Sequence, residues 1–252
     1  MSKVIGIDLG TTFSAIASLD DLGNPEVLAS IEDNRKITAS AVYLKDNEVI
    51  VGDKALNYLK DQSNNVILQT KREMENDVVY STDEGKWVTD KDLVDAYTPA
   101  QVSSLILKKL KEYTSDVKKV VITVPAMFAE KARQATLDAA KIADLEVIEL
   151  INEPTAAVLH YASLPGVEVG GRVMIFDLGG GTFDVTFAEV KNKKVDVMTS
   201  RGDKYLGGRD FDKEITKLMK KKYFDAHNVE IDIENNKEYI HKAEEVKKIL
   251  SV

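Results

Sequence analysis

Two stretches of the chain repeat one arrangement, in which an apolar strand ends in an aspartate and a glycine-containing turn leads into a second strand. The first copy is Val4–Ser14 (VIGIDLGTTFS) and the second is Val173–Asp184 (VMIFDLGGGTFD). Such a pattern predicts two strands joined by a tight turn. Glycines in the turn let backbone N–H groups approach an anion without a Cβ in the way, so phosphate is the ligand that suits these turns. We therefore predict two phosphate-binding loops in one chain.

The distance between the two copies indicates two related lobes. The separation between the two copies is on the scale of half the length of the chain. The repeats of a solenoid, in contrast, recur every ~20 to 50 residues. A single glycine-rich turn would be weak support, because most such turns are ordinary hairpins. Two copies with matched acids, Asp8 and Asp177, favour phosphate binding over a purely structural role for the turns.

The composition excludes several classes of protein. The 252 residues include 34 Lys and Arg against 42 Asp and Glu, a net charge of −8. This acidic balance argues against nucleic acid or an anionic membrane as the main partner. The chain has no cysteine, so disulfides and cysteine metal sites are excluded. Met1–Lys3 runs directly into a strand and no apolar run is long enough to span a membrane, so we expect no signal peptide and a soluble, cytoplasmic protein.

The order of the predicted elements indicates an α/β fold. A hairpin over 4–19 and short strands near 26–30, 41–44 and 49–51 precede a more polar segment, 53–98, which is interpreted as a smaller inserted lobe. Then follow a helix around Val102–Leu110, a continuous apolar strand over 120–124, a helix over 132–142, a strand over 147–151 and a helix that Asn152 can cap. This alternation is typical of an α/β layer, and the unalternating strand favours a sheet covered on both faces.

The second half of the chain is shorter than the first. A hinge near 161–172 precedes strands to about 199, a helix that Asp210 can cap, and a last helix over 236–251. If the duplication is real, elements that would complete the second lobe are missing, so we expect a fragment of a longer protein. His160, His227 and His241 show no ligand spacing and are interpreted as surface or core residues.

Six stretches, spread in order over nearly the whole chain, carry a family resemblance: Gly6–Ser14, Val124–Phe128, Arg133–Thr136, Ile151–Ala157, Asp177–Asp184 and Leu206–Asp212. In these stretches the chain resembles the nucleotide-binding domain of DnaK-type chaperones, the heat shock protein 70 family. The resemblance implies the actin-like ATPase fold, with duplicated, ribonuclease H-like lobes around a nucleotide cleft. Lobe I would be residues 1–165 with an outer insertion at 39–100, and 166–252 a partial lobe II whose outer subdomain begins at about 207.

The resemblance also implies a function. Proteins of this family hydrolyse ATP to control the binding and release of unfolded polypeptide in a separate downstream domain, which serves protein folding and the stress response. The implied partners are a J-domain co-chaperone and a nucleotide-exchange factor, and a monomer is expected.

Electrostatics and the resemblance together predict a metal site. ATP phosphates facing Asp8 and Asp177 would be repelled by about 4 kcal/mol per charge pair at roughly 4 Å and an effective dielectric near 20, so a divalent cation must lie between them. Mg²⁺ is the expected ion because it keeps several waters and uses few carboxylates. By the resemblance, Asp8 and Asp177 would hold those waters, and Glu153 would help to order the metal shell.

The resemblance assigns the catalytic and nucleotide-binding residues as well. Lys71 would reach the γ-phosphate and the attacking water, Glu153 and Asp184 would order that water, and Thr182 would lie beside the γ-phosphate. The two turns would cradle the β- and γ-phosphates with Gly10, Thr11, Thr12, Phe13, Gly179, Gly180 and Gly181. Adenosine would contact Glu244, Lys247, Lys248 and Ser251.

Other assignments are less direct. Gly207 and Gly208 could add a phosphate contact, although a strand-to-helix turn explains them almost as well. Pro125 and Arg133 resemble positions that couple the nucleotide state to the polypeptide-binding domain. The departures from the family pattern are Ala39 for proline, Lys204 for threonine, Lys248 for arginine, and Glu73–Asn76 for a glycine-bearing turn.

Three other functions share parts of this pattern. A sugar kinase and an actin- or MreB-type filament protein use the same actin-like fold, but the stretches Glu153–Ala157 and Asp177–Thr182 are chaperone-like. A short protein that binds nucleotide or co-chaperones without turnover is the third.

Overall fold

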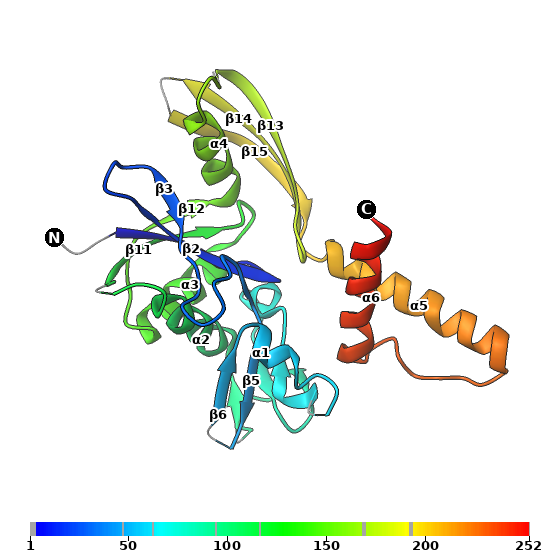
Figure 1. The fold of residues 1–252 in the computed structure, drawn as a ribbon. Helices are drawn as coiled ribbons and strands as arrows, with labels where there is room; N and C mark the ends of the chain where they lie inside the picture. Colours follow the sequence, from blue (N-terminus) through cyan, green and yellow to red (C-terminus); the bar gives the residue numbers. More distant parts are fainter. Residues whose placement is uncertain are drawn as a thin grey trace.

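The computed structural model describes residues 4–46, 48–61, 63–93, 95–115, 117–167, 170–191 and 194–251. Figure 1 shows a mixed body of strands and helices, from which the β13–β15 sheet rises beside α4 and the helices α5 and α6 extend to one side. None of the described helices is long and apolar enough to cross a membrane.

The central sheet has the strand order β12-β11-β1-β2-β3, with β4 also paired to β2. Its strands are β1 (Val4–Asp8), β2 (Phe13–Leu19), β3 (Pro25–Val27), β4 (Thr38–Ala39), β11 (Lys119–Val124) and β12 (Glu146–Asn152). The predicted first hairpin is confirmed, because β1 and β2 pair antiparallel. The β11 strand pairs parallel to both β1 and β12, so the crossovers α2 and α3 join parallel strands.

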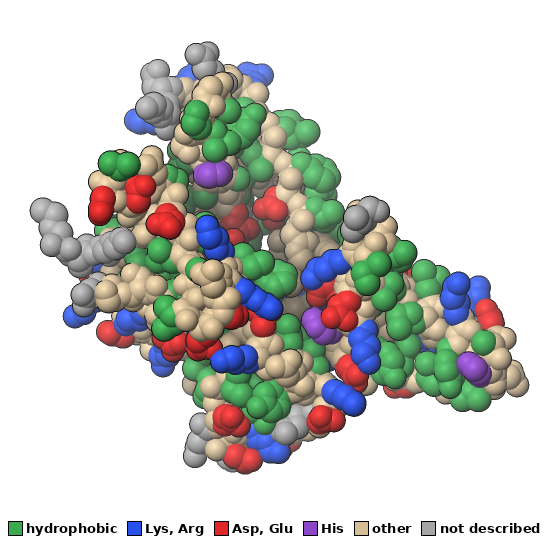
Figure 2. Space-filling model, viewed as in Figure 1, with side chains coloured by type: hydrophobic (Ala, Val, Ile, Leu, Met, Phe, Trp, Pro, Cys, Tyr) green, Lys and Arg blue, Asp and Glu red, His purple; other side chains and the backbone are tan. Residues whose placement is uncertain are grey.

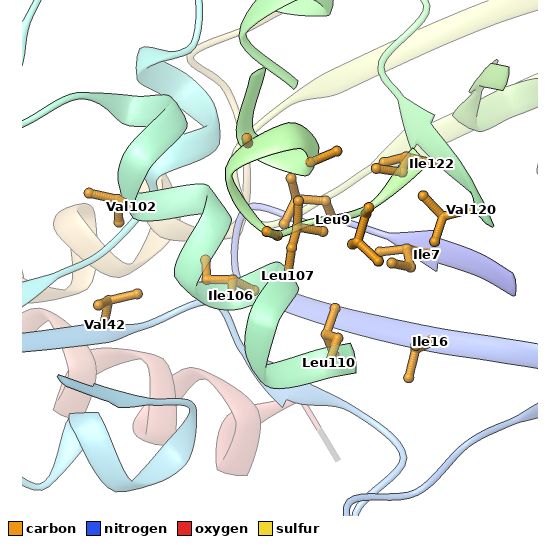
Figure 3. Packing of buried hydrophobic residues seen from close by; sticks show 14 of the residues in the cluster. Ile7, Leu9, Ile16, Val42, Val102, Ile106, Leu107, Leu110, Val120 and Ile122 are labelled. Carbon is orange, nitrogen blue, oxygen red and sulfur yellow. The ribbon is translucent and has the colours of Figure 1, made fainter. Parts of the chain in front are cut away.

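One face of this sheet carries the main core (Figure 3). Helices α2 (Pro99–Lys111) and α3 (Glu130–Ile142) cover it. The side chains of Ile7, Ile106, Leu107, Leu110 and Ile122 are fully buried there, and each contributes about 1.5 to 3 kcal/mol by leaving water. In β11 every second residue is buried and the others are only partly covered. The residues on both faces of this strand are at least partly covered, and one face is packed more tightly than the other.

Local signals fix the ends of the helices, with two corrections. Thr98 and Gln101 form the capping box of α2, and Pro99 occupies its first turn, a position where its missing N–H costs nothing. Asn152 stands at the start of α4 (Glu153–Ser163) without capping it, since its Oδ1 accepts a hydrogen bond of 2.7 Å from Arg133 instead. Asp210 lies inside the first turn of α5, where its carboxylate accepts from the Gly207 N–H at 2.9 Å.

The predicted outer insertion contains two small antiparallel sheets. Its elements are β5 (Val42–Lys45), β6 (Glu48–Val51), α1 (Asp53–Leu56), η1 (Ser63–Asn65), β7 (Val66–Ile67), η2 (Thr70–Glu73), β8 (Val79–Ser81), β9 (Lys86–Val88) and β10 (Ala96–Tyr97). Trp87 packs edge-on against Tyr80, with ring centroids 5.3 Å apart. A second apolar cluster, which includes Tyr43 and Leu59, stabilises the sheet that contains β5.

The C-terminal part begins with three antiparallel strands, β13 (Gly171–Leu178), β14 (Phe183–Lys191) and β15 (Lys194–Asp203). The second predicted hairpin is confirmed as β13–β14. Helices α5 (Gly208–His227) and α6 (Lys237–Leu250) pack against each other. The side of α5 that is buried carries Asp212 and Thr216, whereas the apolar residues Phe211 and Leu218 are exposed. Figure 2 shows hydrophobic side chains at the surface of α5, α6 and the β13–β15 sheet.

Candidate functional site

The two glycine-rich turns, one from each hairpin, lie against each other. A Cβ added to Gly180 would lie 2.0 Å from Thr12 Oγ1, and one added to Gly181 would lie 2.4 Å from Thr11 Cγ2. Real Cβ atoms do not approach other atoms so closely. Glycine is therefore required at 180 and 181 because the hydroxyl side chains of the first turn occupy the space beside the second turn.

A cleft of about 640 Å³ opens between these turns and the start of α4. The predicted residues that line it are Asp8, Gly10, Thr11, Thr12, Phe13, Lys71, Glu153, Asp177, Gly179, Gly180 and Thr182. Gly181 does not line the cleft. Asp184 lines an adjoining cavity of about 240 Å³, to which Lys71 and Thr182 also contribute. The structure thus brings the predicted phosphate, metal and catalytic residues together, from positions spread along the chain.

Two further residues of the cleft are absent from the sequence prediction. Thr123 pairs in register with Asp8 across β1 and β11, and its hydroxyl donates a hydrogen bond of 2.9 Å to Asp8 Oδ1. His160, interpreted from the sequence as a surface or core residue, is exposed and also lines the cleft. It lies two helical turns after Glu153, on the same face of α4, and this spacing is the signal that could have identified it.

The cleft has more acidic than basic groups. Lys71 and Glu153 form a largely buried ion pair, and burial raises the pKa of Glu153 although Lys71 opposes the shift. Burial also raises the pKa of Asp177. The pKa of Asp184 is raised to about 6, first by burial and then by Glu153 and Asp177. Its Oδ1 is buried without a hydrogen-bond partner among the described residues. One lysine therefore faces several acids, and this arrangement favours a bound cation.

The arrangement fits a cation held through water. Within the described ranges, no three His, Asp or Glu side chains gather closely enough to hold a metal ion directly. A hydrated Mg²⁺ does not need such a cluster, because waters and substrate phosphates supply most of its ligands. An added positive charge would give the unpartnered oxygen of Asp184 an electrostatic partner. It would also lower the raised pKa values of Asp177 and Asp184.

A second cavity, of about 340 Å³, lies beside the main cleft. Phe13 lines it from the first turn, and Glu244 and Lys248 line it from α6. Glu244 is paired with Lys248 at 2.7 Å, and its pKa is lowered to about 2, first by the hydrogen bond with His241 and then by Lys248. The Lys248 Nζ lies 5.5 Å from the centre of the Phe13 ring. These residues form a concave, mixed apolar and polar wall that suits a nucleoside.

The other residues predicted to bind adenosine lie elsewhere. Lys247 pairs with Asp212 at 2.8 Å and donates to the Gly208 carbonyl at 2.9 Å. Lys247 lines a smaller cavity of about 190 Å³, together with Gly208. Ser251 donates to the Lys247 carbonyl at 2.8 Å and lines none of the cavities described above.

The amides of Gly207 and Gly208 are engaged inside the protein. Gly207 N–H donates to Asp210 Oδ2 at 2.9 Å, and Gly208 N–H donates to the Gly179 carbonyl at 3.0 Å. The second of these bonds attaches the start of α5 to the second turn. The phosphate contact of the two glycines stays a prediction, and the structure supports the strand-to-helix turn as their other role.

The two hairpins and the cleft between them define the class of actin-like α/β domains built around paired glycine-rich turns. The model of the Hsp70 protein family matches residues 4–252. The chain therefore belongs to the Hsp70 family. It is 42% identical over 243 residues to the chaperone protein DnaK of Mycoplasmopsis agalactiae, which covers 93% of this chain and 37% of the relative. The chain thus spans little more than a third of the length of that relative.

Family membership decides against the sugar-kinase and filament alternatives. The structure also shows what some residues that depart from the family pattern contact. Two of these departures, Lys204 and Glu75, meet in an ion pair of 2.9 Å. Arg133 donates to the Phe128 carbonyl at 3.1 Å and to Asn152, so it joins the segment after Pro125 to the start of α4.

Proposed function

We propose that this chain is the ATP-binding and ATP-hydrolysing part of an Hsp70-type chaperone, with ATP and Mg²⁺ as its ligands. The observation that carries the proposal is the convergence of Lys71, Glu153 and Asp177 on one cleft with two glycine-rich turns. Phosphoryl transfer needs positioning and charge neutralisation more than covalent chemistry, and these residue types supply both.

The proposal gives each residue a role in hydrolysis. Water attacks the γ-phosphorus, the bond to the β-phosphate oxygen breaks, and ADP and phosphate form. Glu153, held by Lys71, accepts a hydrogen bond from the water, while the Lys71 ammonium neutralises charge on the γ-phosphate. Thr182 donates its hydroxyl beside that phosphate. Mg²⁺, when bound, would neutralise phosphate oxygens, and Asp8 and Asp177 are the residues that would hold it through water.

The partners follow from family membership and are proposed on that basis. A J-domain co-chaperone would stimulate hydrolysis, and a nucleotide-exchange factor would release ADP. Unfolded polypeptide would bind a further domain of the longer protein, and Pro125 and Arg133 would couple that domain to the nucleotide. We further propose a cytoplasmic monomer.

The test is calorimetric titration of ATP into the chain with and without Mg²⁺. We expect magnesium-dependent binding that Asp177→Asn weakens by about tenfold or more, equivalent to about 1.4 kcal/mol. Asp196→Asn, at an exposed acid on β15, is the matched control and should bind as the parent chain does. Equal binding by the parent chain and Asp177→Asn would remove Asp177 from the metal site, and no binding by the parent chain would contradict the proposal for this chain.

A further inference from the structure

Arg209 lies where the phosphate turn, α5 and α6 meet. It is the second residue of α5, and its backbone N–H donates to the Gly180 carbonyl at 3.1 Å. Its side chain lines both the 340 Å³ cavity and the 190 Å³ cavity. Arg209 is not among the site residues predicted from the sequence.

Arg209 is partly buried, and the inner part of its guanidinium lacks a partner. Its Nε is buried without a hydrogen-bond partner among the described residues, and across the same ranges the side chain forms no ion pair. Burial lowers the pKa of Arg209, and the charges of Asp212 and Glu244 only partly offset this. Buried polar groups are nearly always hydrogen-bonded, and a buried charge without a partner is costly.

Each acid around Arg209 already has another cation. Asp210 pairs with Arg72 at 2.6 Å, Asp212 with Lys247 at 2.8 Å, and Glu244 with Lys248 at 2.7 Å. Arg72 shows the usual arrangement of a buried arginine, because its Nε also donates to the Gly181 carbonyl at 2.8 Å. Arg209 is therefore a cation in excess, placed to receive an anion from outside the protein.

The position of Arg209 indicates which anion it receives. Thr12 and Phe13 line the main cleft and both smaller cavities, so the three spaces meet at these residues. A nucleotide with its terminal phosphates near Asp177 and its nucleoside near Glu244 must place its remaining phosphates at this junction.

We infer that Arg209 binds the phosphates nearest the nucleoside of a bound nucleoside di- or triphosphate, from the first turn of α5. The inference rests on the proposed function, and it adds a cation from the C-terminal part of the chain to the lysine that faces the γ-phosphate. A planar guanidinium can bond two phosphate oxygens at once. Arg209 therefore raises affinity for the polyphosphate and leaves affinity for the nucleoside unchanged.

The experiment compares Arg209→Gln with Arg201→Gln, at an exposed arginine of β15, by titration of ADP, inorganic pyrophosphate and adenosine in Mg²⁺ at several salt concentrations. We expect Arg209→Gln to weaken ADP and pyrophosphate by about tenfold or more, to reduce their salt dependence, and to leave adenosine unchanged. Arg209→Lys should lose less affinity for ADP and pyrophosphate, because lysine keeps the positive charge but lacks the planar guanidinium that can bond two phosphate oxygens at once. Arg201→Gln should bind all three as the parent chain does.

The outcomes separate this inference from the proposed function. Equal ADP affinity in Arg209→Gln and the parent chain overturns the inference while ATP binding stands. Pyrophosphate binding that depends on Arg209, without any ADP or ATP binding, would show an anion site at Arg209 but overturn both its assignment to a bound nucleotide and the proposed function. Absence of binding by every ligand overturns both. If Arg209→Gln does not fold, Arg209→Lys decides, since unchanged ADP affinity in that variant contradicts a contact through the guanidinium fork.

Discussion

At the scale of single residues, Asp184 is a buried acid in an unfavourable electrostatic environment beside the cleft. It is 5% exposed, one of its oxygens has no partner among the described residues, and it pairs in register with Asp177 on the neighbouring strand. Like charges opposite each other destabilise a sheet. The folded chain therefore carries a cost at this position, which a bound cation would relieve.

This cost predicts how stability depends on pH. The pKa of Asp184 rises from 3.8 to about 6 on folding, so between these values the folded chain holds a proton that the unfolded chain has lost. The contribution of Asp184 to the free energy of unfolding therefore falls as pH rises from 3.8 to about 6. Above this range the destabilisation by the charged carboxylate is complete. Asp184→Asn should stabilise the chain by roughly 1 to 3 kcal/mol above about pH 7, and the gain should vanish below about pH 4.

Urea unfolding in EDTA without nucleotide measures this difference at several pH values. Asp196→Asn, at an exposed acid, controls for the loss of one negative charge from the chain. A stability gain in Asp184→Asn that stays constant from acid to neutral pH would show that the buried carboxylate is not its cause.

At the scale of elements, the start of α5 is fitted to the turn between β13 and β14. Two backbone hydrogen bonds, from Gly208 to Gly179 and from Arg209 to Gly180, join them. The fit is tight at Gly207, where an added Cβ would lie 2.6 Å from the Gly181 nitrogen and 2.7 Å from the Gly180 carbonyl carbon. Both neighbours are backbone atoms, so neither can rotate away.

Gly207→Ala should therefore push α5 away from the turn and destabilise the chain by about 1 to 3 kcal/mol, the usual cost of overpacking. Gly208→Ala is the matched control, because its Cβ would lie at ordinary contact distances of 3.7 and 3.9 Å from backbone atoms and would be close only to the side-chain end of Lys247, at 3.1 Å. Thermal unfolding followed by circular dichroism compares the two. Equal melting temperatures would show that the turn and α5 move freely relative to each other.

At the scale of the whole molecule, two contacts join the outer insertion to the C-terminal helices. Arg72 bonds the Gly181 carbonyl and Asp210. Lys237 of α6 donates to the carbonyls of Ser63 and Val66 at 2.8 and 2.9 Å, and also to the Tyr80 hydroxyl. Burial lowers the pKa of Lys237 to about 8, with a contribution from Arg209. These contacts hold the outer insertion against the C-terminal helices.

Arg72→Gln should open this arrangement, because it removes the bonds to the second turn and leaves Asp210 without its cation. We expect the free energy of unfolding to fall by about 2 kcal/mol, which is less than the loss that follows when a fully buried ion pair is broken. Amides of 179–183 and 207–212 should exchange hydrogen at least about tenfold faster, while those of β11 stay unchanged. Mass spectrometry of hydrogen exchange measures both, with Arg35→Gln at an exposed pair with Asp53 as the control. Unchanged exchange near the second turn would show that Arg72 does not join the two parts.

The sequence by itself determined the two hairpins and the α/β character, because each depends on the spacing of neighbouring residues. In Val173–Asp184 the apolar runs and the glycines between them indicate a strand, a turn and a strand from local sequence alone. The family resemblance added Lys71, whose partner Glu153 lies 82 residues away. Neither pattern nor spacing in the chain connects these two residues.

Only the tertiary structure decided which charges meet. Thr123 reaches Asp8 because β11 pairs with β1 in a particular register, and His160 lines the cleft because α4 presents it beside Glu153. Among the described residues Arg209 has no ion-pair partner, because three other cations pair with Asp210, Asp212 and Glu244. Hydrogen bonds within a turn or helix are set by adjacent residues, whereas pairing between distant charges depends on how the elements pack, and a single sequence does not encode that packing locally.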